Sequence, residues 1–359
     1  MTRSVVLTAG YGVALAGAVA WAALIILAAA SNGTLGFDYR AYDLAVDRLL
    51  AGQSMYDQNA TSTGSFGLFF YPPPFALLVL PFALLPGDLG VGAWTLALAG
   101  ATGAAIWLMP VSNRVRLIVL LLAALSWPLV YAIKLGQVGP MLLLLFAIGW
   151  RWLDRPWPLG AVAGVGTVIK LQPALLIGWA LVTGRRRAAL IGIAVSGLLA
   201  FVATVVSGPQ AWLDEASLLG RVSRPVLTPN AFGFGRLAYE AGLSESLATL
   251  IHWANLGLVA AVVGLAVWRG SAIASYIAVV IATQFVSPVL WDHYALILLL
   301  PVAWLLDRRQ WWAALIPLVS ATLLIGITPP IAYPIAFWVS LAAVAWFGIR
   351  DGRTASMTA

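Results

Sequence analysis

Residues 5–30 read VVLTAGYGVALAGAVAWAALIILAAA and contain no charged side chain. A helix needs about 20 apolar residues to cross the hydrocarbon core of a bilayer, and this stretch is long enough. The run ends in Ala28-Ala29-Ala30, which looks like a signal-peptide cleavage site. It is nevertheless too long for the apolar region of a usual signal peptide, and we expect it to be retained as a membrane helix.

The composition of the rest of the chain points the same way. Of 359 residues, 62% are hydrophobic and only 9% are charged, which is too little polar surface for a water-soluble fold. The net charge of +7 comes from arginines spread singly or in short groups between apolar runs, so it indicates membrane topology and no nucleic-acid partner. There is no cysteine, which excludes disulfides, thiolate metal sites and cysteine nucleophiles.

Hydropathy predicts an all-α polytopic membrane protein with about twelve transmembrane helices. The predicted spans are residues 5–30, 91–110, 117–133, 139–150, 157–169, 171–183, 188–207, 247–268, 272–287, 293–306, 311–327 and 331–349. Residues 72–86 are apolar but short and interrupted by prolines, so they are predicted to be interfacial or re-entrant. We expect a single membrane domain over residues 1–349, followed by a cytoplasmic tail at 350–359.

The distribution of charge orients these spans. With the N-terminus in the cytoplasm, the inner segments hold 13 of the 20 basic residues and 3 of the 13 acidic ones, as the positive-inside rule requires. The C-terminus then also lies in the cytoplasm. The inner loops are short, whereas residues 31–90 and 208–246 form long, chemically varied outer segments. Function is therefore expected on the outer face of the cell membrane.

An amphipathic helix is predicted at the start of the first outer segment, ending near Gly52. Its apolar face would carry Ala41, Leu44, Ala45 and Leu49, and its polar face Arg40, Asp43 and Asp47. Such a helix is typical of a membrane surface. Asp38 stands just before it and has two compatible interpretations, an N-cap of the helix or a functional carboxylate. Asp43 and Asp47 are interpreted as solvated surface residues.

A series of motifs in this order resembles glycosyltransferase family 87, whose members are polyprenol-phosphate-mannose-dependent enzymes of the GT-C fold. The motifs are Asp38-x3-Tyr42, Gly52-x3-Tyr56, Tyr71-Pro72-Pro73-Pro74, Gly136-Gln137 with Pro140, Ile169-Lys170-Leu171-x-Pro173, Asn230 leading to Arg236, and Ser287-Pro288-x2-Trp291-x-His293. The sequence departs from the family pattern at Gly139, where an Asn is frequent, and at Asp292-His293, where paired histidines are common.

The resemblance implies a GT-C-like fold and a mannosyltransferase of the cell envelope. The donor would be a polyprenyl-phosphate sugar, and the acceptor a glycolipid or another glycan. The matching positions implied to bind substrate include Tyr42, Gln137, Asn230, Arg236 and His293. All these motifs fall on the outer face that the charges define independently.

Two lysines have a physical reason to bind phosphate. Lys170 lies between two apolar stretches of only about 13 residues each, which places it below the outer surface, where an unpaired ammonium is costly. It either snorkels to the interface or binds the phosphate of a lipid carrier. Lys134, beside Gly136-Gln137, has the same two interpretations. Arg221, Arg224 and Arg236 are either phosphate ligands or ordinary loop charges.

The expected chemistry needs few groups. A glycosidase uses two carboxylates because it must protonate a poor leaving group. A sugar phosphate already has a good leaving group, so one carboxylate to deprotonate the acceptor, with cations to receive the phosphate charge, is sufficient. We assign Asp38 as the base and expect inversion at C1. No DxD motif or histidine cluster predicts a metal, no cofactor is expected, and no glycine-rich loop beside a lysine indicates direct nucleotide binding.

Two alternatives stay open at the level of sequence. A transporter or lipid flippase would place ionisable residues along a midplane pathway between broken helices. A second enzyme class would use a lipid-diphosphate donor or another sugar such as arabinofuranose.

Overall fold

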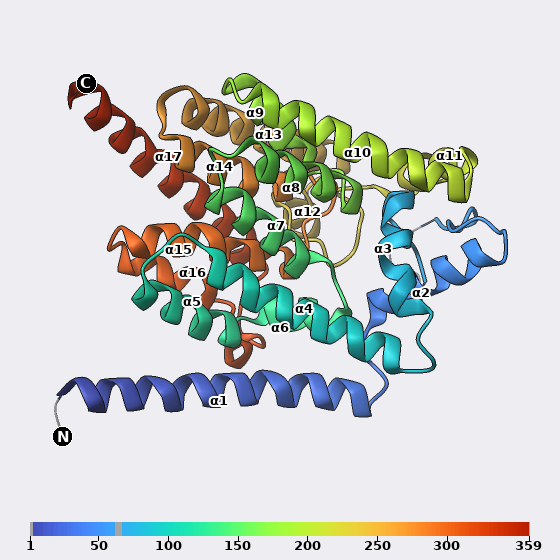
Figure 1. Ribbon diagram of the computed structural model, residues 1–359, viewed down its shortest axis with the longest axis horizontal. Helices are drawn as coiled ribbons and strands as arrows, with labels where there is room; N and C mark the ends of the chain where they lie inside the picture. The colour runs from blue at the N-terminus through green and yellow to red at the C-terminus, as the bar shows by residue number, and fades with distance from the viewer. Residues whose placement is uncertain (1–2, 62–66, 359) are drawn as a thin grey trace.

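The computed structural model describes residues 3–61 and 67–358, with side chains described for residues 8–61 and 67–352. The described residues fold as helices joined by loops, with one isolated bridge between Ser126 and Ala321 (Figure 1). The α-helices are α1 (Arg3–Ser31), α2 (Phe37–Leu50), α3 (Pro73–Ala83), α4 (Leu89–Leu108), α5 (Asn113–Leu125), α6 (Trp127–Leu135), α7 (Gly139–Arg151), α8 (Pro156–Ile169), α9 (Ala174–Val182), α10 (Arg186–Ser207), α11 (Gln210–Val222), α12 (Phe234–Glu240), α13 (Glu245–Arg269), α14 (Ala272–Phe285), α15 (Leu299–Asp307), α16 (Leu315–Leu318) and α17 (Ala332–Thr358). Short 3-10 helices are η1 (Asp292–Leu298), η2 (Trp311–Ala314) and η3 (Thr322–Leu324).

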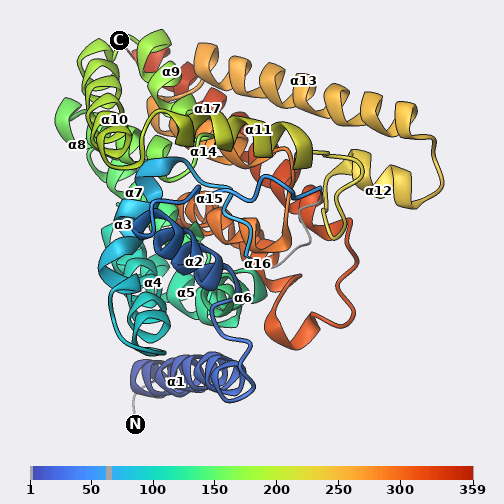
Figure 2. The same cartoon turned by 90° about the vertical axis from the view of Figure 1, so that its right-hand side faces the viewer.

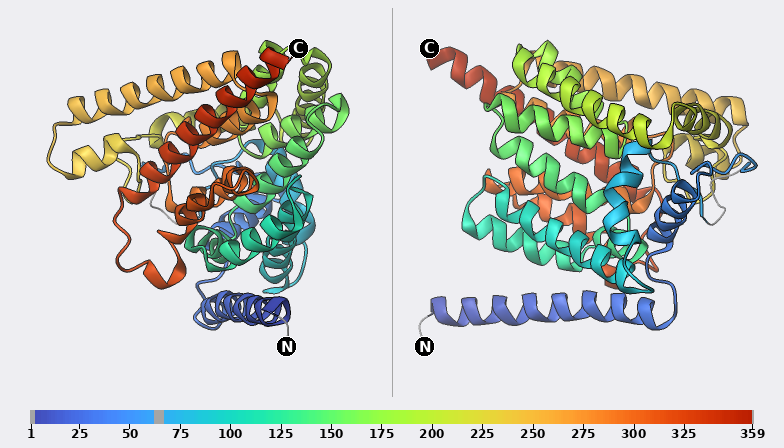
Figure 3. Two further views of the ribbon diagram at one scale, coloured as in Figure 1. Left: turned by 90° about the vertical axis from the view of Figure 1, so that its left-hand side faces the viewer. Right: turned by 45° about the vertical axis from the view of Figure 1, so that its right-hand side comes forward.

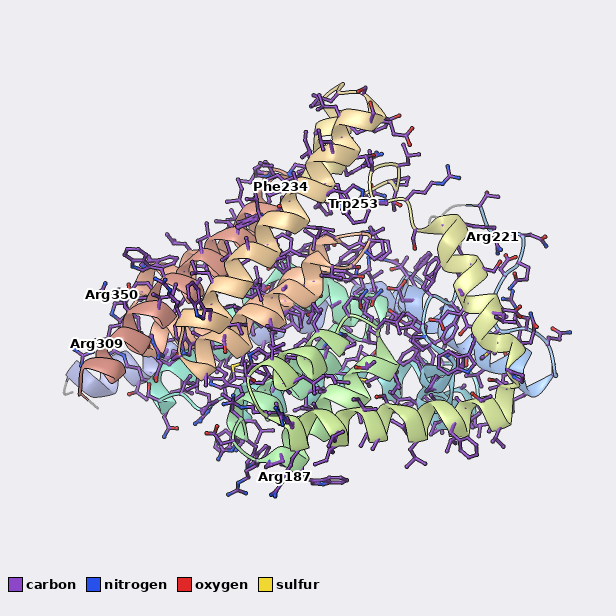
Figure 4. The ribbon with its side chains drawn as sticks, turned by 90° about the horizontal axis from the view of Figure 1, so that it is seen from above. Arg187, Arg221, Phe234, Trp253, Arg309 and Arg350 are labelled. Carbon is purple, nitrogen blue, oxygen red and sulfur yellow. The ribbon has the colours of Figure 1, made fainter. Side chains whose placement is uncertain are left out.

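The bundle has two chemically different ends. Both termini lie at the left of Figure 1, whereas α2, α3 and α11 lie at the right. Three contacts join segments predicted to be inner loops, namely Ser112 N–H to Asp307 Oδ1 at 2.9 Å, Arg185 to Asp154 at 3.3 Å and Arg308 to Asp351 at 2.8 Å. Figure 4 places the labelled Arg309 and Arg350 at the termini's end and Arg221 toward the other. The segments grouped by charge are thus also grouped in space.

The centre of the bundle is formed by α14 and α15, whose residues are buried over almost their whole length. The outer helices α1 and α13 lie on opposite sides of the bundle (Figure 3) and leave most of their apolar side chains uncovered. Uncovered apolar helices of this length are expected to face lipid. Close packing occurs between α8 and α10, where a Cβ on Gly160 would come within 2.3 Å of the carbonyl oxygen of Ala188, so that only glycine fits.

Five helices of the described chain are long and apolar enough to cross a membrane: Thr8–Ser31, Leu89–Leu108, Arg186–Ser207, Glu245–Arg269 and Ala332–Gly352. A sixth span results if α6 and α7, which meet at a bend of 119°, are taken together. Other predicted spans are shorter helices such as α8 and α14, of 14 residues each. At about 1.5 Å per residue these fall short of a bilayer core, so the count of twelve stays a prediction.

Two predicted spans are wrong as continuous helices. Residues 117–133 form α5 and α6, which are separated at Ser126 because Pro128 lacks an N–H and restricts the residue before it. The N–H of Trp127 instead donates to the carbonyl of Ser320 at 2.9 Å. Residues 311–327 form η2, the four-residue α16 and η3, with an extended residue at Ala321. The apolar sequence there covers the core without forming a long helix.

The region of residues 72–86 contains α3, a helix of eleven residues with Pro81 inside it. It is too short to cross, as the sequence indicated. α3 packs beside α2, whose buried face holds Tyr39, Ala41, Tyr42, Ala45 and Val46. A helix in the first outer segment is therefore confirmed, but its buried face packs against the protein and includes Ala41 and Ala45 without Leu44 and Leu49, which are only half-buried. Its expected place on the membrane surface stays a prediction.

Candidate active site

A cavity of about 1210 Å³ lies at the end of the bundle formed by α2, α3 and α11, the end that faces the viewer in Figure 2. It is lined by residues from the first outer segment, the α6–α7 turn, the α8–α9 turn, the second outer segment and the stretch before η1. Seven of the eight predicted site residues line it: Asp38, Tyr42, Lys134, Gln137, Lys170, Asn230 and His293. Positions far apart in the chain therefore share one chamber.

The start of α2 is fixed against the α6–α7 turn. Gly36 and Gly136 both adopt left-handed backbone conformations, with φ of 75° and 79°. The Gly36 N–H donates to the carbonyl of Lys134 at 2.8 Å. A Cβ on Gly136 would come within 2.7 Å of Tyr39 Cβ, so a side chain there would push α2 away. These two glycines bring Asp38 beside Gln137.

A hydrogen-bond chain then orients the Asp38 carboxylate. Gln137 Nε2 donates to Asp38 Oδ2 at 2.5 Å, and Tyr71 donates to Gln137 Oε1 at 2.9 Å. Tyr42 in turn donates to the Tyr71 hydroxyl at 3.0 Å. Because Tyr71 occupies the amide oxygen, the amide nitrogen must face Asp38. The glutamine thus holds one carboxylate oxygen in place.

The interpretation of Asp38 as an N-cap is wrong. α2 begins at Phe37, so Asp38 lies in its first turn, and no side chain caps the helix. Gly36 takes the N-cap position with a left-handed backbone, and the Asp38 carboxylate turns toward Gln137. The helix N-terminus still favours a negative charge at this position.

The electrostatic environment of Asp38 combines opposing effects. Burial raises the pKa of its carboxyl group above the ordinary value, while the charges of His293 and Lys170 and the hydrogen bond from Gln137 act to lower it. Burial likewise raises the pKa of Tyr42 and Tyr71 well above the usual range, so both hydroxyls stay protonated as donors. A carboxyl group with a raised pKa is a stronger base when ionised.

The two lysines reach the cavity from separate turns. α8 ends at Ile169, and Lys170 is extended, with its ammonium hydrogen-bonded to the Tyr294 hydroxyl and 3.8 Å from the centroid of that ring. Lys134, in the last turn of α6, lies 5.8 Å from the ring centroid of Tyr131. Both ammonium groups therefore lie near aromatic rings, and among the described residues neither forms an ion pair with an acid.

His293 and Asp292 form a second polar group on the same wall. His293 is only 5% exposed, and neither ring nitrogen has a hydrogen-bond partner within the described residues. Its Nδ1 lies 3.4 Å from Asp292 Oδ1, and Asp292 Oδ2 accepts from Trp127 Nε1 at 3.1 Å. Burial acts to raise the pKa of Asp292, but the adjacent His293, whose backbone N–H donates to Oδ1 at 2.7 Å, and the hydrogen bond from Trp127 outweigh it, and the pKa lies below the usual value.

Two arginines of the second outer segment, Arg221 and Arg236, are engaged elsewhere. Arg236 does not line the cavity; it pairs with Glu240 at 2.7 Å and donates to the carbonyl of Val226. Arg221 donates to the carbonyls of Ala60 and Asp57 and so joins the two outer segments. Asn230 does line the cavity and has a left-handed backbone, with φ of 57°.

Sequence reasoning missed part of the cavity wall. Tyr294 supports Lys170, and Asp292 supports His293, yet neither was singled out as a site residue. Tyr71 was visible only as the first residue of the Tyr-Pro-Pro-Pro motif. In the described chain no group of three or more His, Cys, Asp or Glu residues could hold a metal ion.

The fold and site define a class: a helical membrane protein with a large end cavity whose lining holds two carboxylates, Asp38 and Asp292, together with cationic side chains. The sequence model of Glycosyltransferase family 87 matches residues 69–291, more than half of the chain, and the protein belongs to this family. His293 lies just after the matched residues, and Asp38 lies well before them. The sequence left two function classes open, an enzyme and a transporter, and membership of this family identifies an enzyme.

Two relatives come from Mycobacterium tuberculosis strains. The chain is 28% identical over 314 residues to a polyprenol-phosphate-mannose-dependent alpha-(1-2)-phosphatidylinositol mannoside mannosyltransferase, an alignment that covers 77% of this chain and 74% of the relative. It is 27% identical over 273 residues to a polyprenol-phosphate-mannose-dependent alpha-(1-2)-phosphatidylinositol pentamannoside mannosyltransferase, covering 69% of this chain and 61% of that relative.

Proposed function

We propose that the protein transfers a hexose, mannose in the first instance, from a polyprenyl-phosphate sugar to a glycolipid or glycan acceptor at the extracytoplasmic face, with inversion at C1. One observation carries the proposal: the Asp38 carboxylate, oriented by Gln137, lines the same cavity as Lys134, Lys170 and His293. The names of both relatives specify a polyprenol-phosphate-mannose donor, which agrees with this inventory.

The cavity has the composition that a lipid-linked sugar requires. Its polar wall carries the lysines for a phosphate group, and its remaining wall includes the apolar side chains of Leu171, Leu175, Val289 and Ile325. An isoprenoid chain needs such an apolar path, whereas the sugar and phosphate need hydrogen bonds and positive charge. A chamber of about 1210 Å³ also has room for an acceptor beside the donor.

The proposed reaction assigns one role to each of these groups. Asp38 takes the proton of the acceptor hydroxyl while the acceptor oxygen forms a bond to C1 of the sugar. The bond between C1 and the phosphate oxygen breaks, and its electron pair leaves with the polyprenyl phosphate. Lys170 and Lys134 stabilise the negative charge that develops on that phosphate. A single displacement converts a β-linked donor into an α-linked product.

The pH dependence of transfer should report the hydrogen bond between Gln137 and Asp38. A base must be ionised, so kcat/KM is expected to fall as pH drops through the pKa of Asp38, which burial holds above its ordinary value. Gln137→Leu removes a hydrogen bond that lowers this pKa, so the acidic limb should move to higher pH. The check is a kcat/KM profile against pH for both proteins.

Tyr71→Phe is the matched control for that profile. Tyr71→Phe removes the hydroxyl that donates to the Gln137 side-chain oxygen but leaves Gln137 in place. The acidic limb of its kcat/KM profile should therefore move less than the acidic limb of Gln137→Leu. An unchanged acidic limb in Gln137→Leu, in a protein that melts normally, would mean that Asp38 is not the group that titrates.

The orientation can be tested by cysteine accessibility, because the natural chain has no cysteine. We expect Ser112→Cys and Arg186→Cys to react with an impermeant maleimide only after the membrane is opened. Asn59→Cys and Ala216→Cys, at the cavity end, should react in intact cells. All four positions are exposed in the structure. Labelling of Arg186→Cys in intact cells would show that the chain has the opposite orientation to the one predicted.

A donor panel tests the proposed function directly. Purified protein is given one acceptor extract and, separately, a polyprenyl monophosphate mannose, a polyprenyl diphosphate sugar, a polyprenyl monophosphate arabinofuranose and a nucleotide sugar. The proposal expects consumption of the first alone. Consumption of the diphosphate or the arabinofuranose donor would move the protein to the second enzyme class, and use of the nucleotide sugar would overturn the donor assignment.

A further inference from the structure

The motif Gly52-x3-Tyr56 takes no part in the reaction proposed above, yet both of its ends have a defined place in the structure. Gly52 has a left-handed backbone, with φ of 69°, and follows the end of α2, where the N–H of Gln53 donates to the carbonyl of Arg48 at 2.8 Å. The chain turns there, and four residues later Tyr56 is buried, with 2% of its surface exposed. The spacing therefore brings a tyrosine from the end of α2 into the protein.

The Tyr56 hydroxyl holds the backbone of a residue that belongs to the hydrogen-bond chain of the active site. It donates to the carbonyl of Tyr71 at 2.8 Å. Tyr71 lies outside any helix or strand, directly before Pro72, so no regular backbone pairing fixes its position. Its own hydroxyl donates to Gln137, which donates to Asp38. Tyr56 thus holds the backbone of the residue that orients the glutamine.

The space between the two tyrosines is filled by Phe69, which is fully buried. Its ring centroid lies 5.5 Å from that of Tyr56 and 5.8 Å from that of Tyr71. A phenylalanine at position 56 would keep this packing, because it has the same ring. The hydroxyl of Tyr56 can therefore be removed without removing its apolar contacts.

Tyr56 is itself anchored by α11 of the second outer segment, which lies at the same end of the bundle as α2 and α3 (Figure 1). Ser54 Oγ accepts the N–H of Tyr56 at 3.3 Å and donates to Asp214 on α11 at 2.5 Å. Further along α11, Arg221 donates to the carbonyl of Asp57 at 3.4 Å. Two contacts with one helix therefore hold the chain on either side of Tyr56.

The protonation of Tyr56 suits a permanent donor. Burial raises the pKa of its hydroxyl well above the usual value, and the nearby carboxylates of Glu215 and Asp214 raise it further. The hydroxyl therefore stays protonated and donates to the Tyr71 carbonyl at any pH at which the enzyme works.

We infer that Tyr56 is a positioning residue for the base: held on α11, it fixes Tyr71 so that Gln137 and Asp38 stay aligned. The inference rests on the proposed function, in which Asp38 takes the proton of the acceptor. Tyr56 does not line the cavity, so it acts through Tyr71 and touches no substrate. The helix α11 does line the cavity, so its seating on the first outer segment is coupled to the alignment of the base.

Tyr56→Phe tests this role in the purified full-length protein, with polyprenyl monophosphate mannose as donor and the acceptor extract. Loss of a neutral hydrogen bond should lower kcat about two- to tenfold, while the donor KM stays within about twofold of wild type. The acidic limb of kcat/KM should move to higher pH, as in Gln137→Leu but less far. A purely structural role would lower the Tm and leave this limb in place.

Tyr276→Phe is the matched control. Tyr276 is also buried and also donates to a backbone carbonyl, that of Phe146 at 2.9 Å, but it lies outside the cavity lining. Its replacement should lower the Tm by a similar amount and keep the wild-type kcat and acidic limb. A double variant that combines Tyr56→Phe with Tyr71→Phe should behave as Tyr71→Phe alone, because Tyr56 acts through Tyr71.

Should Tyr56→Phe fail to fold, Ser54→Ala takes its place. Ser54 is exposed, and its hydroxyl joins the backbone of Tyr56 to α11. The acidic limb of Ser54→Ala should move in the same direction by a smaller amount, and an unmoved limb there would count against the inference.

Additive losses of kcat in the double variant, or an equal loss in Tyr276→Phe, would overturn the role of Tyr56. An unmoved limb in Tyr56→Phe beside a moved limb in Gln137→Leu would also overturn it and leave the proposed function standing. If the limb of Gln137→Leu does not move, the proposed function fails and the role of Tyr56 fails with it.

Discussion

Asp38→Asn is expected to abolish sugar transfer while the protein still folds, inserts and binds the lipid donor. The amide oxygen of asparagine can still accept the hydrogen bond from Gln137, so the local structure is retained. It cannot take a proton from the acceptor hydroxyl. Removal of general-base catalysis should lower kcat at least about 100-fold. The check is the initial rate of transfer with saturating donor, alongside donor binding and melting temperature.

Asp43→Asn and Asp47→Asn provide controls from the same helix. Asp47 is exposed and Asp43 half-buried, and neither lines the cavity, so each should keep near-normal turnover. Asp38→Ala should be as inactive as Asp38→Asn. An active Asp38→Asn enzyme beside an inactive Asp43→Asn would show that the wrong carboxylate was chosen, and activity in all three would refute the mechanism.

Lys170→Ala is expected to impair use of the donor more than any other cation replacement. Its ammonium is held at the cavity wall by Tyr294 and has no carboxylate partner among the described residues, so its charge is available to a phosphate. Loss of a hydrogen bond between the lysine ammonium and the donor phosphate should raise the donor KM by about 10- to 100-fold. Lys170→Arg should recover part of the loss, because the charge survives while the geometry changes.

Arg236→Ala is the informative comparison for that experiment. Sequence motifs grouped Arg236 with Lys170 as a phosphate ligand, but in the structure Arg236 pairs with Glu240 and lies outside the cavity lining. Because Arg236 lies outside the cavity lining and is occupied by Glu240, its replacement should leave the donor KM within about twofold of wild type, a change of under about 1 kcal/mol. A donor KM that changes in Arg236→Ala and stays normal in Lys170→Ala would exchange the roles of the two residues.

Local sequence was sufficient where a short-range pattern decides structure. The apolar spacing around Ala41 and Ala45 predicted α2, and the prolines at 72–74 and 81 predicted a short α3. The position of Lys170 between two apolar stretches predicted a break, which is the extended residue between α8 and α9. Each of these features depends on residues within a few turns of one another.

Features that depend on contacts between distant segments were not predictable in this way. The hydrogen bond from Gln137 to Asp38 joins residues 99 positions apart, and that from Lys170 to Tyr294 joins residues 124 apart. The Asp38 N-cap failed for the same reason, because the carboxylate has a better partner in the α6–α7 turn than in its own helix. Hydropathy also does not show where an apolar run breaks into short helices, which is why residues 311–327 were taken for one helix.

The most direct test of the account is to locate the donor phosphate. A polyprenyl phosphate with a photoreactive group on the isoprenoid unit next to the phosphate is bound to the purified protein, irradiated and mapped by peptide mass spectrometry. Adducts should fall on peptides that contain Lys134, Lys170 or His293, and unlabelled polyprenyl-phosphate mannose should suppress them. Adducts confined to residues 150–155 and 304–308 at the opposite end, or adducts that the unlabelled donor does not suppress, would contradict the assignment of this cavity as the active site.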